Sequence, residues 1–114
     1  MTAFRILLLA IIATVGAYTS VVIANHGPTL FPTFFGDMAE MGWPGQFNLD
    51  FTCMLMLSGL WVAWRHQFSA GGLALGVLAL FLGAPFLSAY LLVASFQSRG
   101  NTRELLLGRA RATA

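Results

Sequence analysis

Hydrophobic residues along this chain gather in three long runs that are separated by polar or proline-containing segments. The runs are Phe4–Ala24, Phe47–Trp64 and Gly71–Phe96, and the sequence shows none of the strict apolar–polar alternation that marks a half-buried strand. A helix needs about 20 apolar residues to cross a hydrocarbon core about 30 Å thick. The pattern therefore predicts an all-α integral membrane protein in which residues 1–114 form a single domain with three transmembrane helices.

The first run carries small residues on one face of its helix. They recur at steps of three or four positions: Ala10, Ala13, Ala17, Ser20 and Ala24. Small residues in such a row let two helix backbones approach closely within lipid. We therefore expect this alanine face (Ala10, Ala13 and Ala17) to pack against another helix. The run also resembles a signal peptide, but because the chain still begins with Met1 we expect it to be retained as an anchor.

Residues 25–46 form the longest polar interruption, and they begin with an Asn-His-Gly-Pro sequence that stops a helix. The segment stays rich in Phe, Leu, Met and Trp, so we expect an interfacial loop with one or two helical turns around residues 36–41. His26, Asp37 and Glu40 form the one cluster of imidazole and carboxylate groups, a conceivable metal site. Their spacing matches no established metal motif, so we predict solvated side chains and no metal.

The second run is short for a transmembrane helix and is bounded by polar residues. About 15 residues, or about 22 Å of helix, separate Asp50 from Arg65, so both ends must reach the headgroups or be paired within the protein. We expect Asp50 at the start of its helix, where free N–H groups and the helix dipole stabilise a carboxylate; a proton or ligand site inside a bundle is the alternative. Arg65 and His66, next to two tryptophans, are typical of a membrane edge, although His66 could instead ligate a cofactor.

The third run carries the clearest packing surface of the sequence. Gly72, Gly76, Ala79 and Gly83 fall on one helix face, called the glycine face below, and allow close backbone approach over three turns. Pro85 lies in the middle of the run and should kink the helix. Two separate spans would have only about 13 residues each, so we expect a tilted, kinked single span, with a re-entrant hairpin as the alternative.

Composition supports a membrane location, because 58% of the residues are hydrophobic and only 9% are charged, whereas soluble domains carry about 25% charged residues. The basic residues are six Arg, of which four lie in the tail, residues 97–114: Arg99, Arg103, Arg109 and Arg111. Such a tail, without interleaved aromatics, favours anionic lipid headgroups over nucleic acid. Residues 102–109 have an apolar centre flanked by Arg and predict a short basic surface helix that ends at Gly108.

The distribution of Arg gives conflicting indications of membrane orientation. Residues 25–46 lack Lys and Arg, which favours an outward-facing loop and an N-terminus in the cytoplasm. With three spans, that orientation would place the four Arg of the tail outside. Counting Arg alone favours the opposite orientation, and on balance we expect the C-terminus in the cytoplasm.

Three stretches of the chain, WPGQFNLDF, LWVAWRHQFS and the closing LLLG, resemble a family of short bacterial membrane proteins of unknown function. The resemblance covers residues 43–108. It implies about three spans and a location in the bacterial inner membrane. It implies no reaction, and no site residues are carried over from it.

These features favour a non-enzymatic, multi-pass protein of the bacterial inner membrane that serves as an accessory subunit of a homo-oligomer or a larger membrane complex. Its expected partners are the lipid bilayer and other membrane subunits or further copies of itself, and not nucleic acid. The first alternative is a protein that binds an apolar ligand, such as a lipid, quinone, carotenoid or chlorophyll-type pigment, against its many aromatic side chains. The second is a small oligomeric transporter or proton-linked channel built around Asp50. We predict no cofactor. The aromatic side chains leave one alternative, which is a bound pigment or quinone.

Overall fold

The computed structural model describes residues 1–113, and within them the chain forms helices and no strand. The helices are α1 (Thr2–His26), α2 (Leu30–Ala39), α3 (Trp43–Arg65), α4 (Ala70–Gln97), α5 (Thr102–Leu107) and α6 (Arg109–Ala112). Three of them, α1, α3 and α4, are long and apolar enough to cross a membrane. These observations confirm the prediction of an all-α chain with three helices of membrane-spanning length.

Helix α3 begins at Trp43, four residues before the predicted start. Pro44 lies in the first turn, where its fixed φ suits a helix and its missing N–H has no helical partner to lose. The helix ends at Arg65, and Gln67 and Phe68 then adopt left-handed backbone conformations with φ of 57° and 56°. This tight turn leads into α4. Ser69 caps the start of α4, because its side-chain oxygen accepts a hydrogen bond from the N–H of Gly72.

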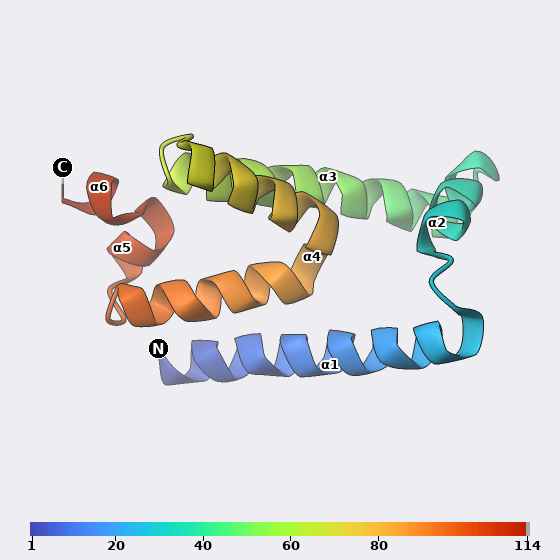
Figure 1. Cartoon of the computed structure of the whole chain (residues 1–114), viewed down its shortest axis with the longest axis horizontal. Helices are drawn as coiled ribbons and strands as arrows, with labels where there is room; N and C mark the ends of the chain where they lie inside the picture. The colour runs from blue at the N-terminus through green and yellow to red at the C-terminus, as the bar shows by residue number, and fades with distance from the viewer. Residues whose placement is uncertain (114) are drawn as a thin grey trace.

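Helix α4 is kinked, as predicted, but it folds back on itself at Gly83, so its shape is the hairpin given above as the alternative and not one tilted helix (Figure 1). Gly83 has φ of 69° and ψ of −145°, a conformation that side chains disfavour, and the break lies two residues before Pro85. The first arm runs along α3 from Gly72, beside His66, to Gly83, beside Phe51. The returning arm brings the chain back to the end of α3 from which it started.

The glycine face of α4 packs inside the chain, against α3. All four of its residues are buried. A Cβ placed on Gly76 would lie 2.8 Å from the carbonyl oxygen of Gly59, and a Cβ on Gly59 would lie 2.8 Å from that of Gly76. The two backbones therefore meet directly, at a separation that only glycine permits.

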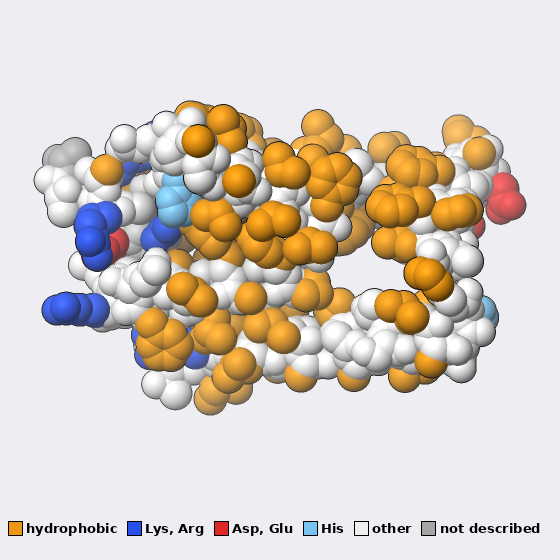
Figure 2. All heavy atoms as spheres, viewed as in Figure 1, with side chains coloured by type: hydrophobic (Ala, Val, Ile, Leu, Met, Phe, Trp, Pro, Cys, Tyr) orange, Lys and Arg blue, Asp and Glu red, His pale blue; other side chains and the backbone are white. Residues whose placement is uncertain are grey.

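Helix α1 packs against the returning arm of α4 near the N-terminus, where Leu8 is buried. Its alanine face (Ala10, Ala13 and Ala17) is exposed and so does not pack within this chain, unlike the glycine face. In Figure 2 an opening is visible between α1 and α3, beyond the turn of α4, because the hairpin ends short of the connection between α1 and α2.

Helix α2 lies at the opposite end of the molecule from α5 and α6 and packs on α3 (Figure 1). It is longer than predicted, since it spans ten residues rather than one or two turns around residues 36–41. Asn48 of α3 donates a hydrogen bond from its side-chain amide to the carbonyl of Phe34 at 3.0 Å. Gly45 is buried against the α2 backbone at Asp37 and Met38.

The hairpin brings both ends of the chain to one end of the molecule, called the arginine end below. A Cβ on Gly100, in the α4–α5 connection, would lie 3.5 Å from the Met1 side chain. All six Arg belong to this end: Arg5 near the start of α1, Arg65 at the end of α3, and Arg99, Arg103, Arg109 and Arg111 in the tail (Figure 2).

Candidate functional site

Arg65 is the most deeply buried charged residue described in the structure, with 9% of its surface exposed, and it joins three helices. Its Nε donates to the carbonyl of Leu105 at 2.7 Å, one terminal nitrogen donates to the carbonyl of Glu104 at 3.3 Å, and the other donates to Tyr90 Oη at 2.9 Å. The two carbonyls belong to the last turn of α5, where free acceptors and the negative end of the helix dipole favour a cation. Arg65 therefore fixes α5 and the returning arm of α4 to the end of α3.

His66 extends this cluster through Tyr90. The two side chains are 2.6 Å apart, from His66 Nε2 to Tyr90 Oη. Because Arg65 already donates to that oxygen, the Tyr90 O–H is available to donate to a neutral imidazole. Burial, and secondly the charge of Arg65, lower the pKa of His66 below its usual 6.5, which favours this neutral form.

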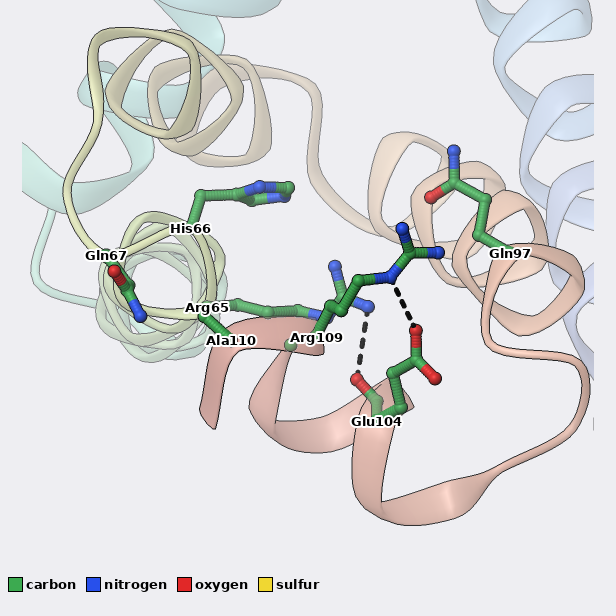
Figure 3. Close-up of a pocket in the computed structure, with 8 residues that line it drawn as sticks. Arg65, His66, Gln67, Gln97, Glu104, Arg109 and Ala110 are labelled. Carbon is green, nitrogen blue, oxygen red and sulfur yellow. Dashed lines mark hydrogen bonds and ion pairs between the residues drawn. The ribbon is translucent and has the colours of Figure 1, made fainter. Parts of the chain in front are cut away.

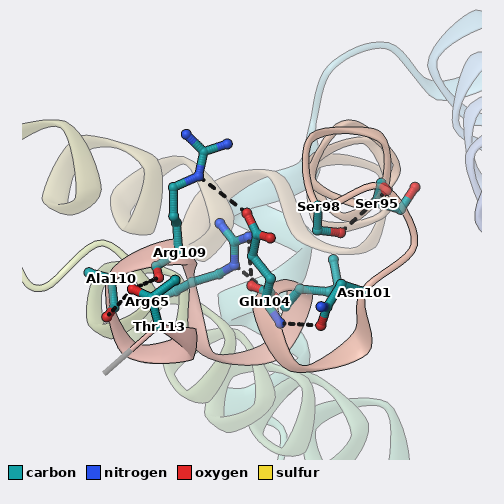
Figure 4. A network of polar contacts seen from close by, with 9 residues as sticks. Arg65, Ser95, Ser98, Asn101, Glu104, Arg109, Ala110 and Thr113 are labelled. Carbon is teal, nitrogen blue, oxygen red and sulfur yellow. Dashed lines mark hydrogen bonds and ion pairs between the residues drawn. The ribbon is translucent and has the colours of Figure 1, made fainter.

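Further contacts hold the tail against the same end of α3. The indole N–H of Trp61 donates to the carbonyl of Leu106 at 3.1 Å. The guanidinium of Arg111 lies 4.0 Å from the ring centre of Trp64 and also hydrogen-bonds to the Trp64 carbonyl. Within the tail, Asn101 caps α5 by accepting from the N–H of Glu104 (Figure 4).

A polar pocket of about 480 Å³ lies between the tail, the end of α3 and the end of α4 (Figure 3). Six side chains contribute the polar groups of its lining: Arg65, His66, Gln67, Gln97, Glu104 and Arg109. In Figure 3 the side chains of His66, Gln97 and Arg109 point toward a common space. Arg109 pairs with Glu104 at 3.3 Å, yet 80% of the Arg109 side chain remains exposed.

Two other pockets are mainly apolar. One, of about 380 Å³, lies between the arms of the α4 hairpin, with Leu75 on the first arm and Phe86, Tyr90 and Val93 on the returning arm. The other, of about 420 Å³, lies at the α2 end, and its lining consists largely of aromatic side chains from α2, α3 and α4: Phe31, Phe34, Phe35, Phe51 and Phe81.

The structure separates the three polar residues that the sequence placed at the membrane edges. Arg65 and His66 lie side by side in the cluster, whereas Asp50 is exposed on α3 near the α2 end. Because α3 starts at Trp43, Asp50 lies about two turns inside the helix, so the prediction that free N–H groups at the helix start would stabilise its carboxylate is wrong.

No group of three or more His, Cys, Asp or Glu side chains that could hold a metal ion occurs among residues 1–113. Sequence analysis missed two contributors to the arginine end. Trp61 reads as one more membrane aromatic, and Arg5 reads as a flanking charge, yet Arg5 donates to both Ser95 Oγ at 2.9 Å and the Ser95 carbonyl at 3.0 Å. Both partners are distant in sequence, so no local pattern indicates them.

The fold and this cluster define an all-helical protein with three helices suited to a membrane and a polar, arginine-rich end. No protein-family model, curated protein or solved structure matches the chain.

Proposed function

We propose that this chain is a non-enzymatic, multi-pass membrane protein that serves as an accessory subunit and packs with other membrane subunits, or with copies of itself, through α1. The observation that carries the proposal is the contrast between the two faces of small residues. The glycine face is fully used inside the chain, while the alanine face is exposed. Lipid gives no hydrophobic reason to cover an apolar face, so an exposed row of small residues supports close packing against a second helix.

The shape of the molecule supports the same proposal. Helix α1 contacts the rest of the chain mainly through the returning arm of α4, and the opening between α1 and α3 leaves its second half uncovered. Within a bilayer, hydrocarbon chains or a helix of another subunit would fill this opening. A transporter is less well supported, because Asp50 lies on the outer surface of α3 and not inside a bundle.

The proposed non-enzymatic character rests on what the buried polar groups do. The Arg65 donors bond to backbone carbonyls and to Tyr90, and those of Arg5 bond to Ser95. These contacts join helices, which is a structural role.

For the membrane orientation, we propose that α1 and α3 cross the bilayer while α4 enters and leaves on one side. Each arm of α4 has about 13 residues, or about 20 Å of helix, which falls short of the hydrocarbon thickness. This arrangement removes the conflict in the Arg count, because all six Arg then share one side, the cytoplasm. The membrane that we propose is the bacterial inner membrane, which rests on the sequence resemblance alone.

The proposal is tested by native mass measurement and crosslinking after mild detergent extraction. We expect an oligomer or a stable complex that Ala13→Ile or Ala17→Ile weakens. Ala74→Ile is the matched control, because Ala74 is equally an exposed alanine on a long helix but lies outside the alanine face. A strict monomer recovered without partners, or equal effects of all three substitutions, would contradict the proposal.

A second candidate function is the binding of an apolar ligand at the α2 end. The aromatic pocket there has about 420 Å³, a size found in small-molecule sites, and almost wholly apolar walls. A lipid, quinone or carotenoid-type molecule would suit such walls. Extraction of the purified protein into organic solvent, followed by mass spectrometry, would detect a retained ligand, and Phe34→Ala should reduce its amount.

A further inference from the structure

The polar pocket at the arginine end and the apolar pocket between the α4 arms share part of their lining. His66 and Gln97 line both of them. From that shared rim one pocket extends over the tail, toward Glu104 and Arg109, and the other runs between the arms toward Phe86, next to the α4 turn. The two pockets, together called the groove below, place a charged site at the helix ends next to an apolar site between the arms of α4.

The polar end of this groove carries a net positive charge. Two arginines, Arg65 and Arg109, line it, and they outnumber its single carboxylate, Glu104. Arg65 has five N–H groups, and three of them bond to the described part of the chain, which leaves one on each terminal nitrogen for a further acceptor. Gln97 adds an amide donor on the opposite side of the pocket (Figure 3).

The Arg65 part of the site is preorganised. Arg65 as a whole residue is 9% exposed, and its guanidinium is fixed by the α5 carbonyls and by Tyr90, so an incoming anion need not immobilise it. A buried guanidinium also interacts more strongly with an anion than an exposed one, because water screens it less. The other cation, Arg109, is exposed and supplies an adjustable contact.

From this geometry we propose that the groove binds one anionic phospholipid, with its phosphate against Arg65, Arg109 and Gln97 and an acyl chain between the arms of the α4 hairpin. Charge complementarity selects the anionic head, since planar guanidinium groups bind phosphate oxygens in pairs. The apolar slot selects an attached hydrocarbon chain over a free phosphate. The inference depends on the chain lying in a membrane and is independent of whether it has a protein partner.

The test measures lipid binding to the purified full-length protein in neutral detergent, by native mass spectrometry during titration. The probes are phosphatidylglycerol, phosphatidylcholine with the same acyl chains, and inorganic phosphate. We expect phosphatidylglycerol to bind at least about tenfold more tightly than phosphatidylcholine or phosphate. Equal binding of the two lipids, or tighter binding of free phosphate, would overturn the proposal.

Three variants locate the binding in the groove. Arg109→Gln should weaken phosphatidylglycerol binding about three- to tenfold, whereas Arg103→Gln, which removes an exposed tail Arg outside the groove, should not. Ala89→Leu narrows the slot between the arms and should weaken phosphatidylglycerol binding without changing phosphate binding. Equal losses in the two Arg variants would indicate general attraction to a basic tail and overturn the proposal, as would an unaffected Ala89→Leu variant. If the purified protein is a monomer but still binds phosphatidylglycerol in this way, the proposed subunit function is contradicted and the lipid site is not.

Discussion

Gly59 of α3 and Gly76 of α4 meet backbone to backbone, so that a Cβ on either residue would lie 2.8 Å from the carbonyl oxygen of the other. Backbone atoms cannot move aside as a flexible side chain can. This contact sets the distance between α3 and the first arm of α4, and with it the position of the hairpin.

Gly76→Ala should therefore destabilise the protein. Overpacking of a close contact costs about 1–3 kcal/mol, and we expect a loss of that size in the free energy of unfolding measured by denaturing-detergent titration. Gly71→Ala is the control. Gly71 lies on the same helix, but a Cβ placed there would have no neighbouring atom within 4 Å. Equal stability of the two variants would show that α3 and α4 do not pack as described.

Arg65→Lys should release the tail. An ammonium group cannot reproduce the planar arrangement that reaches Leu105, Glu104 and Tyr90 together, and each lost charged hydrogen bond costs about 1.5–3 kcal/mol. We expect trypsin to cleave the tail at Arg109 faster in this variant. Arg99→Lys, an exposed change before α5, should leave the cleavage rate at Arg109 unaltered, and an unaltered rate in Arg65→Lys as well would refute the anchoring role.

Acidification should weaken the arginine end through His66. Its pKa in the folded protein is below 6.5, so its contribution to stability is fully present above pH 6.5 and is lost as the pH falls through the lower, folded-state pKa. We expect the melting temperature in detergent to fall between pH 7.5 and 5.5, and His66→Gln to reduce that dependence. His26→Gln, an exposed change at the α2 end, should retain it; a dependence that follows His26 instead would contradict this assignment.

Asp50→Asn should have little effect on folding. The Asp50 carboxylate is exposed and lies two turns inside α3, so its charge does not stabilise a helix end. We expect the free energy of unfolding to change by less than about 0.5 kcal/mol, as for other surface substitutions. A loss above 1 kcal/mol would reveal a partner for Asp50 and return the transporter hypothesis to consideration.

The sequence predicted the three long helices well, because a long apolar run identifies a membrane-type helix independently of its neighbours. Helix boundaries were less predictable where proline was involved. Pro32 and Pro44 lie in residues 25–46, which we expected to form a loop, yet both lie in the first turn of a helix, where proline is well tolerated. Proline can therefore mark either the end or the beginning of a helix, depending on whether it lies after the last turn or within the first turn.

Span length left the hairpin only as an alternative, and no local pattern indicated the turn at Gly83 or the polar cluster. Gly83 belongs to a packing face by its spacing, and nothing in that spacing shows that it also adopts a positive φ and reverses the chain. Arg65 was predicted at a membrane edge, but its link to Tyr90, 25 residues away, exists only because the returning arm comes back to the end of α3. Non-local contacts of this kind follow from the turn and not from the residues themselves.

The proposal that α4 enters and leaves the membrane on one side can be checked with single cysteines, because it fixes the side of the membrane that each one faces. In a Cys53→Ser background, Thr2→Cys, Glu40→Cys and Thr113→Cys each add one thiol at an exposed position, and a membrane-impermeant maleimide is applied to intact cells and to inverted vesicles. The hairpin predicts that Thr2→Cys and Thr113→Cys are labelled only in inverted vesicles and Glu40→Cys only in intact cells. Labelling of Thr2→Cys and Thr113→Cys from opposite sides would show that α4 crosses the membrane and would contradict the account.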